Sequence, residues 1–286
     1  MTPPRAAVRT NNAARIVCQV GTDGPDAARS PLRGRDADFA ALADLLARRC
    51  RLITVTGAAG CGKTRLAGDL AHRHHGAFPH GVVVAMMSTV TDAVDVPRAL
   101  CRALGLVVPD DSTVVERLQH ILKRRRMLLV IDNFEHVIEA APTVAALSRH
   151  CRDMTFVVTS RRPLRAVGEH VVHIRPLALP TPDDDPATAT NSPAVQMFCD
   201  HARAVTSRFA GTQAEVAAVA EICRRLDGLP LAIEVAAARS GLLSPAVMLE
   251  QLAGTGPLTV FDDAVDPSAR RHSLRATLQW SYQLLQ

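Results

Sequence analysis

Four short and almost uninterrupted apolar runs divide the first half of the chain, and helical patterns separate them. The runs cover residues 52–56 (LITVT), 82–86 (VVVAM), 127–131 (MLLVI) and 156–159 (FVVT), and a weaker run covers 171–174. Strands that are apolar on both faces are typical of a parallel sheet covered by helices on its two sides. Apolar residues at helical spacing over 36–49 predict a helix before the first strand. We therefore expect an α/β domain.

The pattern changes near residue 190. Residues 179–192 are rich in Pro, Asp and Thr, which predicts a linker. Helical spacing then predicts helices over 195–205, 214–226, 229–240 and 245–252, and no further strand. Residues 1–31 have no apolar periodicity and predict a flexible N-terminal segment. The expected order is a flexible segment (1–31), an α/β domain (32–178), a linker (179–192) and an all-helical domain (193–256).

Two local signals mark helix ends in the α/β half. Thr113 and Glu116 have the spacing of a capping box, in which each side chain bonds the other's backbone N–H. Gly105 follows Leu100 and Leu104, where a glycine commonly ends a helix. A helix is thus expected to end near 105 and another to begin near 113.

The strongest chemical signal is the segment GAAGCGKT at 57–64, between the first strand and a predicted helix. It fits the G-x-x-x-x-G-K-[ST] pattern of a phosphate-binding loop, and the strand–loop–helix context disfavours a chance glycine-rich turn. Glycines let backbone N–H groups turn toward a phosphate, and the helix directs its positive end there. We expect Lys63 to neutralise the β- and γ-phosphates and Thr64 to bind Mg²⁺. The predicted nucleotide-binding residues here are Gly57, Ala58, Ala59, Gly60, Cys61, Gly62, Lys63, Thr64 and Arg65.

The third apolar run ends at Asp132, which is expected to complete the Mg²⁺ site. A strand-ending aspartate in an ordinary turn is the alternative. Many P-loop ATPases place a glutamate directly after this aspartate, but here Asn133 follows and the nearest carboxylate is Glu135. The sequence therefore predicts tight nucleotide binding with slow, Mg-dependent ATP hydrolysis. Lys63, Asp132, Glu135 and Arg161 are the candidate catalytic residues.

Arg161 and Arg162 follow the fourth apolar run. A cationic strand end beside the phosphate loop could contact the γ-phosphate, whereas a pair of surface arginines is the alternative reading. The residues alone leave both open.

Taken together, these motifs resemble a STAND-class P-loop ATPase of the NB-ARC type, as in the ATPase modules of large bacterial LuxR-type and SARP-type transcriptional regulators. LRGRD at 32–36 resembles the family's N-terminal motif, which implies that Gly34 and Arg35 lie near the adenine. GAAGCGKT and LLVIDNFEH resemble the Walker A and Walker B segments. TSRRPL resembles the sensor segment, which implies Arg161 at the γ-phosphate, although Arg162 departs from the expected acid. GLPLA at 228–232 resembles the ARC motif and implies Pro230 against the base.

The resemblance carries expectations about architecture and mechanism. It implies a P-loop NTPase parallel five-stranded sheet in the order 2-3-4-1-5, followed by an all-α helical ARC-like domain. It also implies a switch, in which ADP holds a closed form and ATP permits opening and assembly. Residues 271–282 resemble the first helix of a winged-helix domain, so 257–286 is expected to be a connector and the truncated start of that domain.

Charge and cysteine content limit the partners and the compartment. The 33 Lys and Arg against 28 Asp and Glu give a net charge of +5, which predicts no dense phosphate-neutralising surface, so direct DNA binding is disfavoured. The basic run 123–126 is interpreted as the decoration of a helix C-terminus. The seven cysteines are spread without a C-x-x-C pair, and no apolar run could span a membrane. We expect a soluble cytoplasmic protein. Cys61 is the one cysteine whose thiolate a helix N-terminus could stabilise, and the alternative is a small residue tolerated at a variable position of the loop.

Two classes of function follow from these observations. The first is an ATP/ADP-dependent signal-transduction switch with slow hydrolysis, a module of a transcriptional regulator whose partners are other protein domains or further copies of itself. The second is a non-catalytic nucleotide-binding or protein-interaction fragment of such a regulator.

Overall fold

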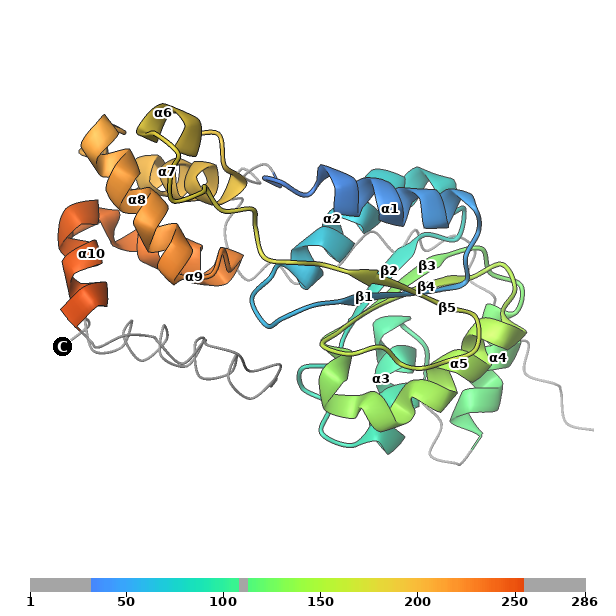
Figure 1. Cartoon of the computed structure of the whole chain (residues 1–286). Helices are drawn as coiled ribbons and strands as arrows, with labels where there is room; N and C mark the ends of the chain where they lie inside the picture. The colour runs from blue at the N-terminus through green and yellow to red at the C-terminus, as the bar shows by residue number, and fades with distance from the viewer. Residues whose placement is uncertain (1–31, 108–112, 255–286) are drawn as a thin grey trace, which may run out of the picture.

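The computed structural model describes residues 32–107 and 113–254, which form an α/β region and a helical region (Figure 1). The predicted flexible segment 1–31 and the predicted connector and winged-helix start at 257–286 lie outside the described residues. No helix in the described part of the chain is long and apolar enough to cross a membrane.

The α/β region is built on a parallel sheet of five strands in the order β2-β3-β4-β1-β5, which confirms the predicted order. The strands are β1 (Leu52–Thr56), β2 (Val82–Met86), β3 (Leu128–Asp132), β4 (Thr155–Ser160) and β5 (Glu169–His173). β4 lies between β3 and β1. The strand that carries Asp132 and the strand that leads into the phosphate loop are therefore separated by the strand that ends beside Arg161.

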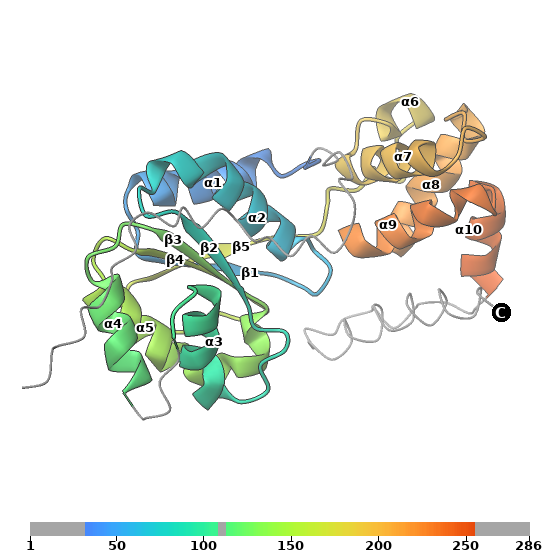
Figure 2. The same cartoon turned by 180° about the vertical axis from the view of Figure 1, so that it is seen from behind.

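Helices cover both faces of this sheet (Figure 1, Figure 2). α1 (Asp36–Ala47) and α2 (Lys63–His74) lie on one face, and α3 (Val96–Ala103), α4 (Val114–Leu122) and α5 (Ala141–His150) lie on the other. Ile53 and Val55 of β1 pack with the α2 residues Leu66 and Leu70, whereas Leu52 belongs to the core on the opposite face. β1, β3 and β4 are buried on both faces, which explains their continuous apolar runs.

The strand limits differ slightly from the apolar runs. β3 extends to Asp132 because that residue still pairs with Met86 in the ladder, and backbone pairing does not require an apolar side chain. β5 lies at the sheet edge and pairs with β1, so its side chains are only partly buried. This partial burial accounts for the weak apolar signal of β5.

The two predicted helix-end signals have different outcomes. Gly105 adopts a left-handed conformation (φ 66°) directly after α3, as predicted. α4 begins after Thr113, but the Thr113 side chain makes no capping hydrogen bond, so the predicted capping box is wrong. A capping box forms instead at Thr212 and Glu215, at the start of helix α8 (Gln213–Arg225).

The helical region contains α6 (Pro186–Ala189), α7 (Pro193–Val205), α8 (Gln213–Arg225), α9 (Pro230–Ala237) and α10 (Pro245–Gly254). It has a core of its own, to which α7, α8 and α9 contribute Phe198, Ile222 and Ile233. The helix predicted over 229–240 is α9 followed by a 3₁₀ turn, Ala238–Gly241. Figures 1 and 2 show this region beyond the carboxyl ends of the strands.

Part of the predicted linker is ordered as α6. The side chain of Asp185 accepts a hydrogen bond from the backbone N–H of Thr188, and Pro186 occupies the first helical turn. Hydrogen bonds from Thr188 lower the pKa of the Asp185 carboxyl. Ala189 is buried in the helical core. A Pro-rich composition therefore hid a short capped helix, because Asp-Pro is also a helix-start signal.

Candidate nucleotide-binding site

The phosphate loop connects β1 to α2 in the conformation that its glycines permit. Gly57 (φ 154°) lies so close to β5 that an added Cβ would stand 2.5 Å from the carbonyl oxygen of Ile174. Gly62 (φ 94°) is the N-cap of α2, and a Cβ there would enter open space. A left-handed backbone at these positions disfavours other residues. The open space above Gly62, at the positive end of α2, suits an anionic group.

Lys63 places a buried positive charge against this loop. Its side chain is 7% exposed, and its ammonium Nζ donates to the carbonyl oxygens of Gly57 (3.1 Å) and Ala58 (2.9 Å). A buried ammonium needs such partners because its desolvation is costly. Lys63 therefore lies in the loop, with its charge at the amino end of α2.

Three side chains meet at the carboxyl ends of β3 and β4. The Thr64 hydroxyl donates to the Asp132 carboxylate, with Oγ1 2.8 Å from Oδ1, and the Thr159 hydroxyl donates to the same oxygen. Asp132 is 1% exposed, and the backbone N–H of Asn133 donates to Thr159. The structure thus brings together Thr64 and Asp132, the two predicted Mg²⁺ ligands. Thr159 is an additional member, and carboxylate with hydroxyl oxygens suits Mg²⁺.

Glu135 and Arg161 form an ion pair across the same edge of the sheet. Arg161 Nε lies 3.1 Å from Glu135 Oε1, with Arg161 44% and Glu135 12% exposed. The second oxygen, Oε2, is buried and has no hydrogen-bond partner in the described structure. Asn133 has a left-handed backbone (φ 59°), so the chain turns directly after Asp132. The sequence alone did not indicate that Glu135 and Arg161 contact each other, whereas in the fold they form a direct ion pair.

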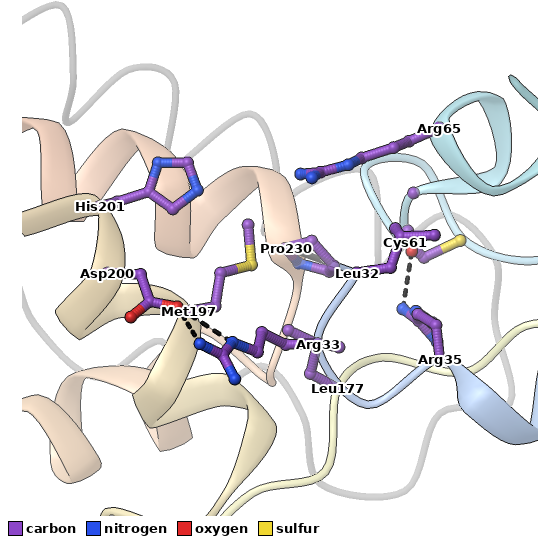
Figure 3. A pocket seen from close by; sticks show the side chains of 11 residues that line it. Leu32, Arg33, Arg35, Cys61, Arg65, Leu177, Met197, Asp200, His201 and Pro230 are labelled. Carbon is purple, nitrogen blue, oxygen red and sulfur yellow. Dashed lines mark hydrogen bonds and ion pairs between the residues drawn. The ribbon is translucent and has the colours of Figure 1, made fainter. Parts of the chain in front are cut away.

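A pocket opens between the phosphate loop and the helical region (Figure 3). Its lining comprises Leu32, Arg33, Arg35, Cys61, Gly62, Arg65, Leu177, Met197, Asp200, His201 and Pro230. Of the residues predicted to bind nucleotide, Arg35, Cys61, Gly62, Arg65 and Pro230 line this pocket. Gly34 lies outside the lining, in a left-handed turn packed on Pro193.

Arg35 braces the phosphate loop. Its guanidinium donates to the backbone oxygens of Cys61 (2.8 Å) and Arg175 (2.6 Å) and pairs with Asp38 (3.0 Å). With the side chain only 6% exposed, this charge is satisfied within the protein. Arg35 therefore fixes the loop beside the pocket.

The helical region contacts the phosphate loop directly. Pro230 stands in the first turn of α9, and the backbone N–H of Leu231 donates to the Gly60 carbonyl, 3.1 Å away. The backbone N–H of Leu177 donates to the Gly228 carbonyl at 2.9 Å. These main-chain bonds link the two regions at the pocket.

The face of α7 supplies three pocket residues that the sequence analysis did not single out. Asp200 holds an ion pair with Arg33, with Oδ2 and Nη2 2.8 Å apart. Figure 3 shows Met197 and His201 beside this pair. The Nε2 atom of His201 is buried and has no hydrogen-bond partner within the described ranges. The spacing 197, 200 and 201 on one face of a predicted helix was the available signal.

The structure favours the second reading of Cys61, a small side chain tolerated within the loop, over a stabilised thiolate. The side chain is completely buried, and burial raises the pKa of the thiol despite the nearby charges of Lys63 and Arg35. Desolvation disfavours the charged thiolate more than these cations favour it. Cys61 is therefore a neutral side chain beneath the loop.

Comparisons of the chain with known protein families and structures indicate the same kind of fold. Residues 46–167 match the family model described as an AAA domain. The sheet order and the loop at this position decide the fold class. The fold is that of a P-loop NTPase. The chain also aligns with the crystal structure of a Cdc6p from Pyrobaculum aerophilum, at a TM-score of 0.57 and 15% identity, over 76% of this chain and 64% of that one.

Two relatives from Mycobacterium tuberculosis are more similar in sequence. "Uncharacterized protein Rv0894" is 37% identical over 88% of this P-loop NTPase chain, and the chain spans 61% of that relative's length. "Putative HTH-type transcriptional regulator Rv0890c" is 35% identical over 82% of this chain, which spans 25% of that protein. The aligned parts therefore include the helical region as well as the P-loop domain.

Proposed function

We propose that the protein is an ATP/ADP-binding signal-transduction switch, of the STAND and NB-ARC type, with slow ATP hydrolysis. The observation that supports this most is the hydrogen bond from Leu231 in α9 to Gly60 in the phosphate loop. Because both regions line the pocket, a bound nucleotide would contact both. A ligand that contacts two regions differently in two states shifts their equilibrium.

The side chains at the phosphate loop and in the pocket fit a nucleotide and its metal. The phosphates would lie in the open space at Gly62, next to the Lys63 ammonium and the amino end of α2. The base would lie against Arg35 and Pro230. Thr64 and Asp132 would hold Mg²⁺, whose charge would offset that of the phosphates. Arg161 would contact the γ-phosphate.

A non-catalytic nucleotide-binding module is the second candidate, favoured by two observations. Asn133 follows Asp132, and Glu135 is engaged by Arg161. A carboxylate oxygen that is paired with a guanidinium is not free to orient a water molecule. Both features favour slow turnover, so the two candidates differ in whether any turnover depends on Lys63 and Asp132.

A role in transcription is supported by the similarity to the putative HTH-type regulator. We propose that this chain is the nucleotide-dependent module of such a regulator, in the cytoplasm, and that its ATP form assembles with other protein domains or with copies of itself. The similarity of 271–282 to a winged-helix start belongs to the same proposal.

Hydrogen–deuterium exchange with ADP or with Mg-ATP tests the switch. We expect exchange in α7 and α9 to differ between the two nucleotides, because these helices line the pocket. Equal protection by both nucleotides would contradict a switch while leaving nucleotide binding intact. Failure to bind either nucleotide would contradict both candidates.

Replacing Arg161 with alanine is expected to weaken ATP binding roughly 10-fold or more while leaving ADP binding nearly unchanged. A hydrogen bond to a charged group contributes about 1.5–3 kcal/mol, and only ATP carries the γ-phosphate. Isothermal titration with both nucleotides measures this difference. Arg162→Ala is the matched control, because Arg162 is an exposed neighbour. An equal loss for ATP and ADP would exclude a γ-phosphate contact.

His201→Phe is expected to weaken ATP binding roughly 3- to 10-fold. His201 lines the pocket, and its buried Nε2 atom has no hydrogen-bond partner among the described residues; a neutral hydrogen bond contributes about 0.5–1.5 kcal/mol. Tripolyphosphate lacks a base and should bind the variant and the parent equally. An equal loss for ATP and tripolyphosphate would show that the substitution acts on the phosphate loop and not on the base.

A further inference from the structure

Basic residues gather at the edge of the sheet opposite the nucleotide pocket. They belong to the segments that enter β1, β4 and β3, and all are exposed. We call them the basic edge: Arg49, Arg51, Lys123, Arg124, Arg125, Arg126, Arg149 and Arg152. Because strands β3, β4 and β1 are neighbours, these three segments lie side by side, about 4.8 Å apart per strand. Distant parts of the sequence thus form a single row of positive charge.

The centre of the row is hollowed. Arg49, Arg51, Arg149 and Arg152 line an open hollow on the surface, and its lining includes no other residue. Arg49 has a left-handed backbone (φ 56°), which is uncommon for a residue with a Cβ. An arginine thus occupies a position where glycine would be less strained.

The charges of the basic edge are not neutralised by the described parts of the chain. None of the ion pairs among the described residues includes a member of the basic edge. By contrast, Arg48, which directly precedes Arg49 and is not part of the basic edge, forms an ion pair with Asp44. The three segments contain one acidic residue, Asp153, which directly follows Arg152.

The C-terminal ends of three helices offset part of the repulsion between the cations of the basic edge. α1 and α4 end at Ala47 and Leu122, directly before basic residues, and α5 ends at His150, between Arg149 and Arg152. The negative end of each helix dipole favours nearby cations, as the sequence analysis expected for 123–126. Each dipole end is worth about half a charge, so three of them offset only part of eight positive charges.

We propose that the basic edge binds the phosphate backbone of double-stranded nucleic acid without reading its sequence. Arginine guanidinium groups match phosphate oxygens in a bidentate way, and a row of cations fits a row of phosphates. The three segments contain no Phe, Tyr or Trp, the side chains on which unpaired bases stack best, so a duplex fits better than a single strand. The mild net charge of +5 concealed this surface because the fold concentrates it at one edge.

A paired charge-removal experiment tests this proposal. The parent chain, the edge variant Arg51→Ser/Arg152→Ser and the control variant Arg162→Ser/Arg208→Ser are titrated against a short fluorescent DNA duplex. The control removes the same charge from two exposed arginines away from the basic edge, one at the carboxyl end of β4 and one in the helical region, and neither belongs to an ion pair among the described residues. Fluorescence anisotropy is read at about 50 mM and about 200 mM salt.

The edge variant should bind DNA roughly 10-fold more weakly at low salt, and its salt slope should fall by about 2. The control variant should bind like the parent. Equal losses in the two variants would overturn the proposal, because net charge alone would then explain the binding. Binding of an acidic peptide such as poly-Glu, without binding of DNA, would also overturn it and identify a protein partner. Unchanged ATP binding by the edge variant confirms that it remains folded, and this readout is independent of the basic edge.

Discussion

Replacing Lys63 with alanine is expected to weaken the binding of ATP by about 100-fold or more, and that of ADP by about 10-fold or more. The Lys63 ammonium lies in the phosphate loop, held by two carbonyl oxygens, at the positive end of α2. Hydrogen bonds to charged groups contribute about 1.5–3 kcal/mol each, and about 1.4 kcal/mol corresponds to a tenfold change. The loss of two contacts, to the β- and γ-phosphates of ATP, therefore exceeds a hundredfold, whereas ADP loses only the contact to its β-phosphate. Isothermal titration in the presence of Mg²⁺ measures the loss.

The chain supplies its own control for this experiment. Lys123 is the other lysine of the sequence, and it is exposed on the opposite edge of the sheet. Lys123→Ala should bind both nucleotides like the parent protein. Nucleotide binding that survives Lys63→Ala would contradict the assignment of the phosphate site, whichever candidate function is correct.

Replacing Gly228 with alanine is expected to lower the free energy of unfolding by about 3 kcal/mol or more. Gly228 has a left-handed backbone (φ 64°), and a Cβ there would stand 2.4 Å from the carbonyl oxygen of Leu177. The obstacle is main chain and cannot rotate away. The left-handed conformation costs about 1–2 kcal/mol by itself, and displacement of the Leu177 segment adds to it. Urea denaturation followed by circular dichroism measures the change.

Gly105 separates the two contributions to this cost. It has nearly the same backbone conformation (φ 66°), but a Cβ there would meet nothing within 4 Å. Gly105→Ala should therefore cost only about 1–2 kcal/mol, the conformational part alone. Equal destabilisation by the two substitutions would show that the Leu177 segment yields without cost, and that its bond to Gly228 does not hold the regions together.

The sheet and the phosphate loop were predictable because their signals are local and strong. Buried strands impose continuous apolar runs, and the loop requires glycines at fixed positions before Lys63. The strand order came from the resemblance, since the runs by themselves do not fix the neighbours of each strand. The edge strand β5 gave the weakest signal because only part of it is buried.

The remaining features depend on contacts between distant residues. The pair of Glu135 with Arg161 joins two strands, and the pair of Arg33 with Asp200 joins the two regions. Neither leaves a pattern along the sequence. The same holds for the basic edge, whose charges come from three segments far apart in the chain. Helix α6 was missed for a different reason, because proline is common both in linkers and in the first turn of a helix.

The bond between Leu231 and Gly60 joins main chain to main chain. Its donor is a backbone N–H and its acceptor a backbone carbonyl, while the Leu231 side chain is 39% exposed. Any amino acid except proline can donate this hydrogen bond. Substitution of the side chain at position 231 therefore preserves the hydrogen bond between the helical region and the phosphate loop. This exposed position can vary among related proteins, and so can the surface that it presents to a partner.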